Sequence, residues 1–116
     1  MIRRKQELVV LKRENVKNGK GIFINELLLN EDEFYHKGRL FARCKLAPGD
    51  FVGNHTHEQE MEVCYFLSGK GMVESNGIIS EINAGDVHIV HPGENHSVIN
   101  NGTEDLEYIA LILYAI

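Results

Sequence analysis

The chain has 116 residues, the length of one ordinary domain, so any site must be assembled from residues around a single core. Hydrophobic residues make up 43% and charged residues 25% of the chain, with 11 Gly and only 2 Pro, a composition typical of globular rather than disordered proteins. The 12 Lys and Arg against 17 Asp and Glu give a net charge of -5, which argues against a nucleic-acid partner.

Apolar segments are all short. None approaches the roughly 18 residues that a membrane span needs, and the run at 8–11 near the N-terminus is too short for the core of a signal peptide. We therefore expect a cytoplasmic protein with no membrane partner. In that compartment Cys44 and Cys64 are expected as thiols rather than as a structural disulfide.

Basic residues are concentrated at the start of the chain, where seven of the 12 lie within residues 1–20. Runs of like charge usually lie on solvated surfaces or tails. We expect residues 1–20 to form a basic N-terminal arm or an edge strand, and residues 21–116 to form the folded barrel.

Short apolar runs separated by turn residues occupy the rest of the chain. Asn76-Gly77 between two such runs is a strong signal for a two-residue hairpin, because both residue types tolerate a positive φ. No helix is indicated. The spacing favours an all-β sandwich or barrel, with strands expected at 22–29, 39–46, 62–67, 71–75, 78–82, 87–91 and 106–114.

The last of these strands, 106–114, is apolar on both faces. Leu106, Tyr108, Ala110, Ile112 and Tyr114 alternate with three other apolar residues, so almost no side is left for solvent. A strand of this kind needs cover on both faces. A second subunit could supply the outer cover, and we therefore predict a homodimer.

Histidines carry the strongest chemical signal. His55 and His57 are two residues apart, so on one strand their side chains would point the same way at roughly 6.5 Å and could converge on one ion if the strand twists. Glu62 follows on the next strand, and His96 lies in a distant turn. Together they would offer three nitrogen ligands and one oxygen, with coordination positions left open.

Two motifs in the chain resemble those of the cupins. The first runs through Gly49, His55, His57, Glu62 and Gly69 at the family's spacing, within residues 49–69. The second, within residues 85–100, resembles the family pattern at Gly85, Gly93, His96 and Asn100 but has His91 at a position that is usually proline.

The resemblance implies a single-domain cupin double-stranded β-helix, a jelly-roll barrel. It also implies one divalent transition metal per chain, held by His55, His57, Glu62 and His96. Imidazole and carboxylate ligands suit Fe or Mn, which the resemblance favours, and also Zn, Ni, Co or Cu.

A metal with open positions can polarise an oxygen, lower the pKa of bound water or bind dioxygen beside a chelating substrate. We expect a small metalloenzyme of the dioxygenase, decarboxylase or isomerase type acting on a metal-chelating carboxylate or hydroxy-carbonyl compound. The alternative is a non-catalytic cupin that binds a sugar or an organic acid. In either case the partner is a small molecule.

Candidates for proton transfer beside the metal are Glu60, His91 and Cys64, and less so His88. For Cys64, a role as a small buried apolar filler of the core is favoured over a thiol with a chemical role. A decarboxylase would also need an arginine directed at the substrate carboxylate. Arg43 is the basic strand residue best placed in the sequence, but its alternation predicts that it faces outward.

Overall fold

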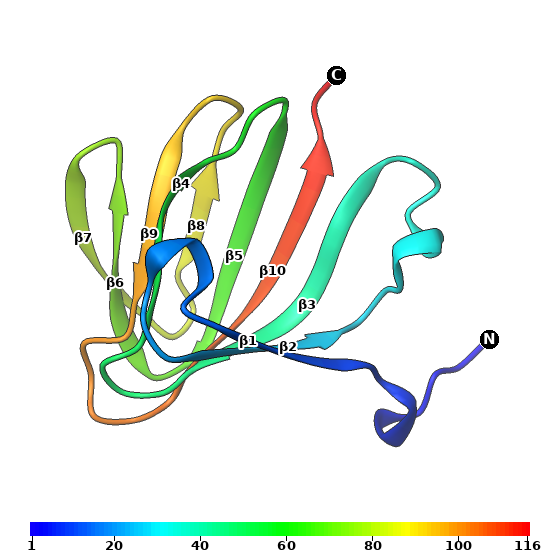
Figure 1. The fold of residues 1–116 in the computed structure, drawn as a ribbon, viewed down its shortest axis with the longest axis horizontal. Helices are drawn as coiled ribbons and strands as arrows, with labels where there is room; N and C mark the ends of the chain where they lie inside the picture. Colours follow the sequence, from blue (N-terminus) through cyan, green and yellow to red (C-terminus); the bar gives the residue numbers. More distant parts are fainter.

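The computed structural model describes residues 1–116 and confirms the all-β prediction. Two antiparallel sheets, with strand orders β1-β2-β3-β10-β5-β8 and β4-β9-β6-β7, curl round a common interior (Figure 1). Three short 3-10 turns, η1 (Lys5–Glu7), η2 (Val16–Asn18) and η3 (Glu31–Glu33), interrupt the strands. The strands are β1 (Val10–Glu14), β2 (Ile22–Leu27), β3 (Gly38–Leu46), β4 (Phe51–Thr56), β5 (Glu60–Ser68), β6 (Lys70–Ser75), β7 (Ile78–Asn83), β8 (Val87–Val90), β9 (Asn95–Ile99) and β10 (Leu106–Tyr114).

The seven strands expected from apolar runs correspond to β2, β3, β5, β6, β7, β8 and β10. The predicted hairpin is confirmed, because Asn76 and Gly77 join β6 to β7 with φ of 51° and 83°. Three further strands, β1, β4 and β9, lie in polar segments that give no apolar alternation. Pairing with a neighbouring strand stabilises these segments, and a local pattern does not reveal it.

Side chains on the inner face of β5 change from polar to apolar along the strand. Glu60, Glu62, Cys64 and Phe66 are all buried, in this order. Phe66 packs against Tyr108 of β10 with ring centroids 5.1 Å apart, within the apolar core. The carboxylates at the start of β5 therefore lie at the opposite end of the barrel interior from Phe66.

β10 lies in the middle of the larger sheet, paired with β3 on one side and β5 on the other. Its inner residues, from Leu106 to Ile112, are buried, as the alternation predicted. The outer residues Ile109, Leu111 and Leu113 are half-buried.

The N-terminal segment, residues 1–20, contacts both sheets of the barrel. β1 forms the edge of the larger sheet, and the η2 turn that follows lies against β4, in blue in Figure 1. A Cβ on Gly53 of β4 would lie 1.9 Å from the backbone oxygen of Lys17 in η2. Glycine at position 53 is therefore required for this close approach of the two backbones. None of the helical segments has the length and apolarity that a membrane crossing requires.

Candidate metal site

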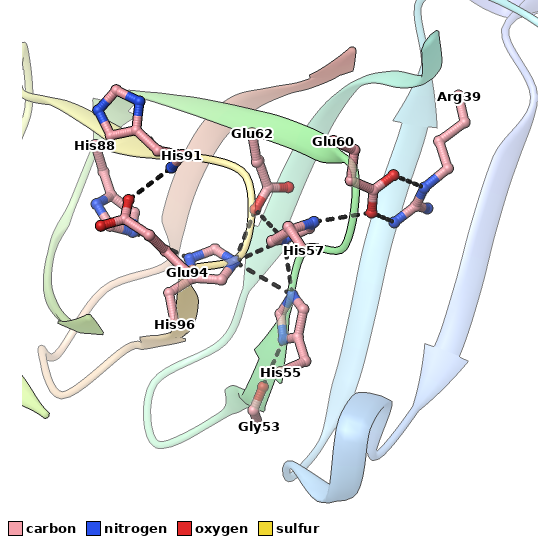
Figure 2. Close-up of polar contacts among 10 residues, drawn as sticks. All are labelled: Arg39, Gly53, His55, His57, Glu60, Glu62, His88, His91, Glu94 and His96. Carbon is pink, nitrogen blue, oxygen red and sulfur yellow. Dashed lines mark hydrogen bonds and ion pairs between the residues drawn. The ribbon is translucent and has the colours of Figure 1, made fainter. Parts of the chain in front are cut away.

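Four side chains from three strand regions converge at one end of the barrel interior (Figure 2). His55 lies on β4, where it pairs in register with His96 of β9, and His57 follows directly after β4. Glu62 reaches them from β5 in the other sheet. Their candidate ligand atoms all lie within 4.8 Å of one another.

The three imidazole Nε2 atoms form a nearly equilateral triangle. The separation is 3.1 Å from His55 to His57, 3.1 Å from His57 to His96 and 3.2 Å from His96 to His55. The Oε1 atom of Glu62 lies 2.8 Å from Nε2 of His96 and 3.3 Å from Nε2 of His57. Three nitrogens and one oxygen therefore face a common point.

Contacts at the far side of each ring determine which nitrogen faces inward. His55 donates its Nδ1–H to the carbonyl oxygen of Gly53 at 2.8 Å, and His57 donates its Nδ1–H to Glu60 Oε1 at 3.0 Å. Neither acceptor can donate in return, so in the neutral ring the lone pair is on Nε2. Lone pairs from His55 and His57 then face each other, an arrangement that a cation between them would stabilise.

The donor set and its spacing fit a transition metal. Bonds of about 2.1 Å from a metal to two ligands at right angles place those ligands about 3 Å apart. The separations between neighbouring donor atoms match this value. Imidazole with carboxylate is a ligand set for Fe, Mn, Co, Ni, Cu or Zn, and a set of four donors leaves positions open for a substrate.

Charges at the cluster are set by burial and by hydrogen bonds. Burial opposes ionisation of Glu62, but hydrogen bonds from His57 and His96 outweigh it and hold its pKa at about 2. Burial also opposes the charged form of His57, yet the contacts with Glu62 and Glu60 raise its pKa. In the absence of a metal, the two carboxylates therefore favour the protonated form of His57.

Glu60 and Arg39 support His57 from behind. Arg39 donates from Nε and from a terminal nitrogen to the two oxygens of Glu60, both at 2.7 Å, while Glu60 accepts from His57 (Figure 2). The guanidinium is the largest cause of the lowered pKa of Glu60, so the carboxyl is ionised. Arg39, Glu60 and His57 form a continuous chain that fixes the plane of the His57 ring.

His88 plays the corresponding part for His96. Its Nε2 lies 3.0 Å from Nδ1 of His96, and its ring is half-buried. Burial, helped by charge on His96, lowers the pKa of His88 to about 4, so the ring is neutral and can accept the Nδ1–H of His96. The sequence offered His88 only as a less favoured candidate for proton transfer. Pairing of β8 with β5, which places His88 opposite Cys64, accounts for its inward position.

The other residues expected to transfer protons lie in different places. Cys64 is fully buried, and burial raises its thiol pKa well above the usual value. His91 is exposed, and its backbone N–H donates to Glu94 at 2.7 Å. Of the three candidates, Glu60 is the one that lines the cavity beside the cluster of His55, His57, Glu62 and His96.

A cavity of about 270 Å³ opens from the four-residue cluster. Its walls include Val52, Val98 and Tyr108 together with three basic residues, Arg13, Lys17 and Arg39. Sequence reasoning missed these cations. The register between β10 and β3 shifts next to Arg39, which lines the cavity. Arg43 faces outward, as expected, and forms an ion pair with Glu107. Nothing in the local pattern placed Arg13 and Lys17 near the site.

Comparison with known proteins agrees with the motifs. The model of the cupin domain family matches residues 42–112, more than half of the chain. A protein of Thermotoga maritima named oxalate-binding protein is 42% identical over 113 residues, which are 97% of this chain and 93% of that protein.

Solved structures show the same fold. The crystal structure of a predicted oxalate decarboxylase from Thermotoga maritima has a TM-score of 0.92 and 42% identity, covering 98% of this chain and 99% of that one. A double-stranded β-helix protein from Klebsiella pneumoniae has a TM-score of 0.70 at 22% identity, covering 80% and 77%. The family match, the two motifs and the double-stranded β-helix together show that this chain belongs to the cupin family.

Proposed function

We propose that this cupin holds one divalent transition metal on His55, His57, Glu62 and His96 and binds a small metal-chelating carboxylate at the open positions. The observation that carries the proposal is the convergence of three Nε2 atoms and one carboxylate oxygen at the wall of a cavity. The metal would supply Lewis acidity and two neighbouring positions for ligand oxygens. Fe or Mn is the metal we favour.

Oxalate is the first ligand to test. Its two carboxylates present oxygens that can occupy neighbouring positions on one metal, and the Thermotoga relative bears the name oxalate-binding protein. The cavity of about 270 Å³ lies just below the range of about 300–1,000 Å³ that accommodates drug-sized ligands. Its size therefore suits a small metabolite.

Metal content and ligand binding can be measured on the same preparations. Elemental analysis is expected to find about one transition metal per chain, and a His57→Ala, His96→Ala double variant should lose it. His91→Ala is the matched control, because this exposed histidine belongs to no part of the cluster. Oxalate should raise the melting temperature of the metal-loaded protein but not of the stripped protein. Full metal content in the double variant would refute the ligand assignment.

Turnover is the second candidate function, and Glu60 is the observation that favours it. Its carboxylate lies on the cavity wall, is ionised beside Arg39 and contacts His57. We propose Glu60 as the proton acceptor of a decarboxylase, dioxygenase or isomerase reaction, ahead of Cys64 and His91. Incubation of the metal-loaded protein with oxalate, followed by assay of formate, carbon dioxide and oxygen uptake, tests this. Tight binding with no product would assign the chain to the non-catalytic binding class.

The outer face of the larger sheet is the proposed contact with a second copy of the chain. Leu111 of β10 lies in register between Phe41 of β3 and Val63 of β5, and Val63 pairs with Ile89 of β8. Ile89 is 46% exposed, and the other three are half-buried. Light scattering at micromolar concentration should give the mass of a dimer, and Ile89→Glu should lower it. A monomeric mass of the unmodified protein would contradict this assignment.

A further inference from the structure

The N-terminal segment supplies basic residues to the same cavity as the metal ligands. Arg13 comes from β1 and Lys17 from η2, and both line the cavity whose wall also includes His55, His57, Glu62 and His96. Lys17 is held in the left-handed region with φ of 56° as η2 packs against β4. The N-terminal segment therefore forms the edge strand of the larger sheet and also contributes two basic residues to the cavity.

Arg13 is directed toward the interior by contacts with buried residues. It pairs in register with Phe23, and its guanidinium lies 5.9 Å from the centroid of the Phe23 ring. A terminal nitrogen of Arg13 also donates to Oδ1 of Asn25, which is completely buried and in turn donates to Sγ of Cys44. One amide oxygen uses a small part of the capacity of a guanidinium, which has five N–H donors.

Charge at the cavity is unevenly compensated. Arg39 is neutralised by two contacts with Glu60, and Glu62 is engaged by His57 and His96. Neither Arg13 nor Lys17 has a carboxylate within 4.0 Å. Glu58, the remaining acid of the wall, is exposed and makes no ion pair. Arg13 and Lys17, two exposed residues that line the cavity, thus have no anionic partner from the chain.

We propose that Arg13, assisted by Lys17, binds a second anionic group of the ligand, so that the ligand is a 2-oxo or 2-hydroxy acid with an additional carboxylate. This inference rests on the proposed function, because the chelating end of the acid would occupy the metal. The planar guanidinium matches a carboxylate in a two-point contact, and the Phe23 ring restricts its movement. Oxalate uses both of its carboxylates to chelate the metal and has no further carboxylate for Arg13.

Pairs of acids that differ in one end group test this directly. Isothermal titration of the manganese-loaded protein would compare malate with α-hydroxybutyrate, and α-ketoglutarate with α-ketovalerate. The dicarboxylate of at least one pair should bind on the order of ten- to a hundredfold more tightly, the range for a hydrogen-bonded charge pair. Arg13→Gln should remove this preference while oxalate binding is retained, and Arg13→Lys should keep part of it.

Arg43→Gln is the matched control, because Arg43 faces outward and pairs with Glu107. It removes the same charge from the protein without touching the cavity and should leave the preference unchanged. Equal binding within both pairs, or a preference that survives Arg13→Gln, would overturn this inference. If oxalate still binds in that case, the proposed function stands. If neither oxalate nor any of the four acids binds the metal-loaded protein, both proposals fail.

Discussion

His57 donates its Nδ1–H to Glu60 across 3.0 Å while Arg39 holds the same carboxylate through two contacts of 2.7 Å. The ring is thereby fixed with Nε2 toward His55 and His96. A ligating imidazole that is oriented in this way does not have to be ordered when the metal binds. Glu60 and Arg39 are therefore expected to affect the proposed metal site even though neither is among its four proposed ligands.

Glu60→Gln should weaken metal binding. The amide keeps the size of the side chain but loses the charge that holds His57 and Arg39, and loss of such a supporting contact costs about ten- to a hundredfold in affinity. Competition with a chelator of known affinity measures the change. Glu58→Gln removes an exposed carboxylate with no partner and is the control. Equal affinities for the two variants would contradict the role given to Glu60.

Metal should be released as the pH falls below about 6, because imidazole binds a metal only when it is neutral. Burial opposes the charged form of His57, but the contacts with Glu62 and Glu60 raise its pKa, so its proton competes more strongly with the metal. Burial lowers the pKa of His55, which favours its metal-binding form. Equilibrium dialysis across this range gives the occupancy. Unchanged occupancy at roughly pH 5 would count against three histidine ligands.

His88→Gln should change how the stability of the metal-free protein depends on pH. Burial, with charge on His96, depresses the folded-state pKa of His88 from its usual 6.5 to about 4. A depressed pKa gives stability that is present above the unfolded-state value and is lost as the pH falls toward the folded-state value.

The wild type should therefore lose stability relative to His88→Gln between pH 6.5 and about 4. Urea unfolding of both proteins at several pH values measures the difference. The glutamine can still accept from His96 but does not titrate. A difference that stays constant over this window would show that His88 is not neutral in the folded protein.

Gly53→Ala should displace the η2 turn. The added Cβ would lie 1.9 Å from the backbone oxygen of Lys17, and a backbone atom cannot rotate away as a side chain can. Overpacking of this kind costs about 1–3 kcal/mol, and the shift also affects the carbonyl that orients His55. We expect a lower free energy of unfolding and weaker metal binding. Asn54→Ala, at the neighbouring exposed position, should change neither; equal effects of the two variants would contradict the packing argument.

Residue types and spacing in the sequence were sufficient to predict the four clustered side chains. His55, His57 and Glu62 are close together in the chain. The Asn76-Gly77 turn predicted the hairpin of β6 and β7, and the apolar runs predicted seven of the strands. His96 was predicted to join them because it lies at the histidine position of the second cupin-like motif, within residues 85–100. Such features are local or recur at fixed spacing, so they can be recognised in one chain without coordinates.

Only the tertiary structure decided which other side chains meet the site. The sequence shows that residues 13 and 17 are basic but not where they lie. Pairing of β1 with β2 brings Arg13 to the cavity, and packing of η2 against Gly53 brings Lys17 there. Packing of the two sheets likewise brings His88 of β8 to His96 of β9, and Arg39 of β3 reaches Glu60 of β5 across β10. Contacts of this kind join residues on different strands, and they form because the sheets curl and bury their inner faces together. The spacing of residues therefore predicted the four clustered side chains, whereas the pairing and packing of the strands determined which other residues surround them.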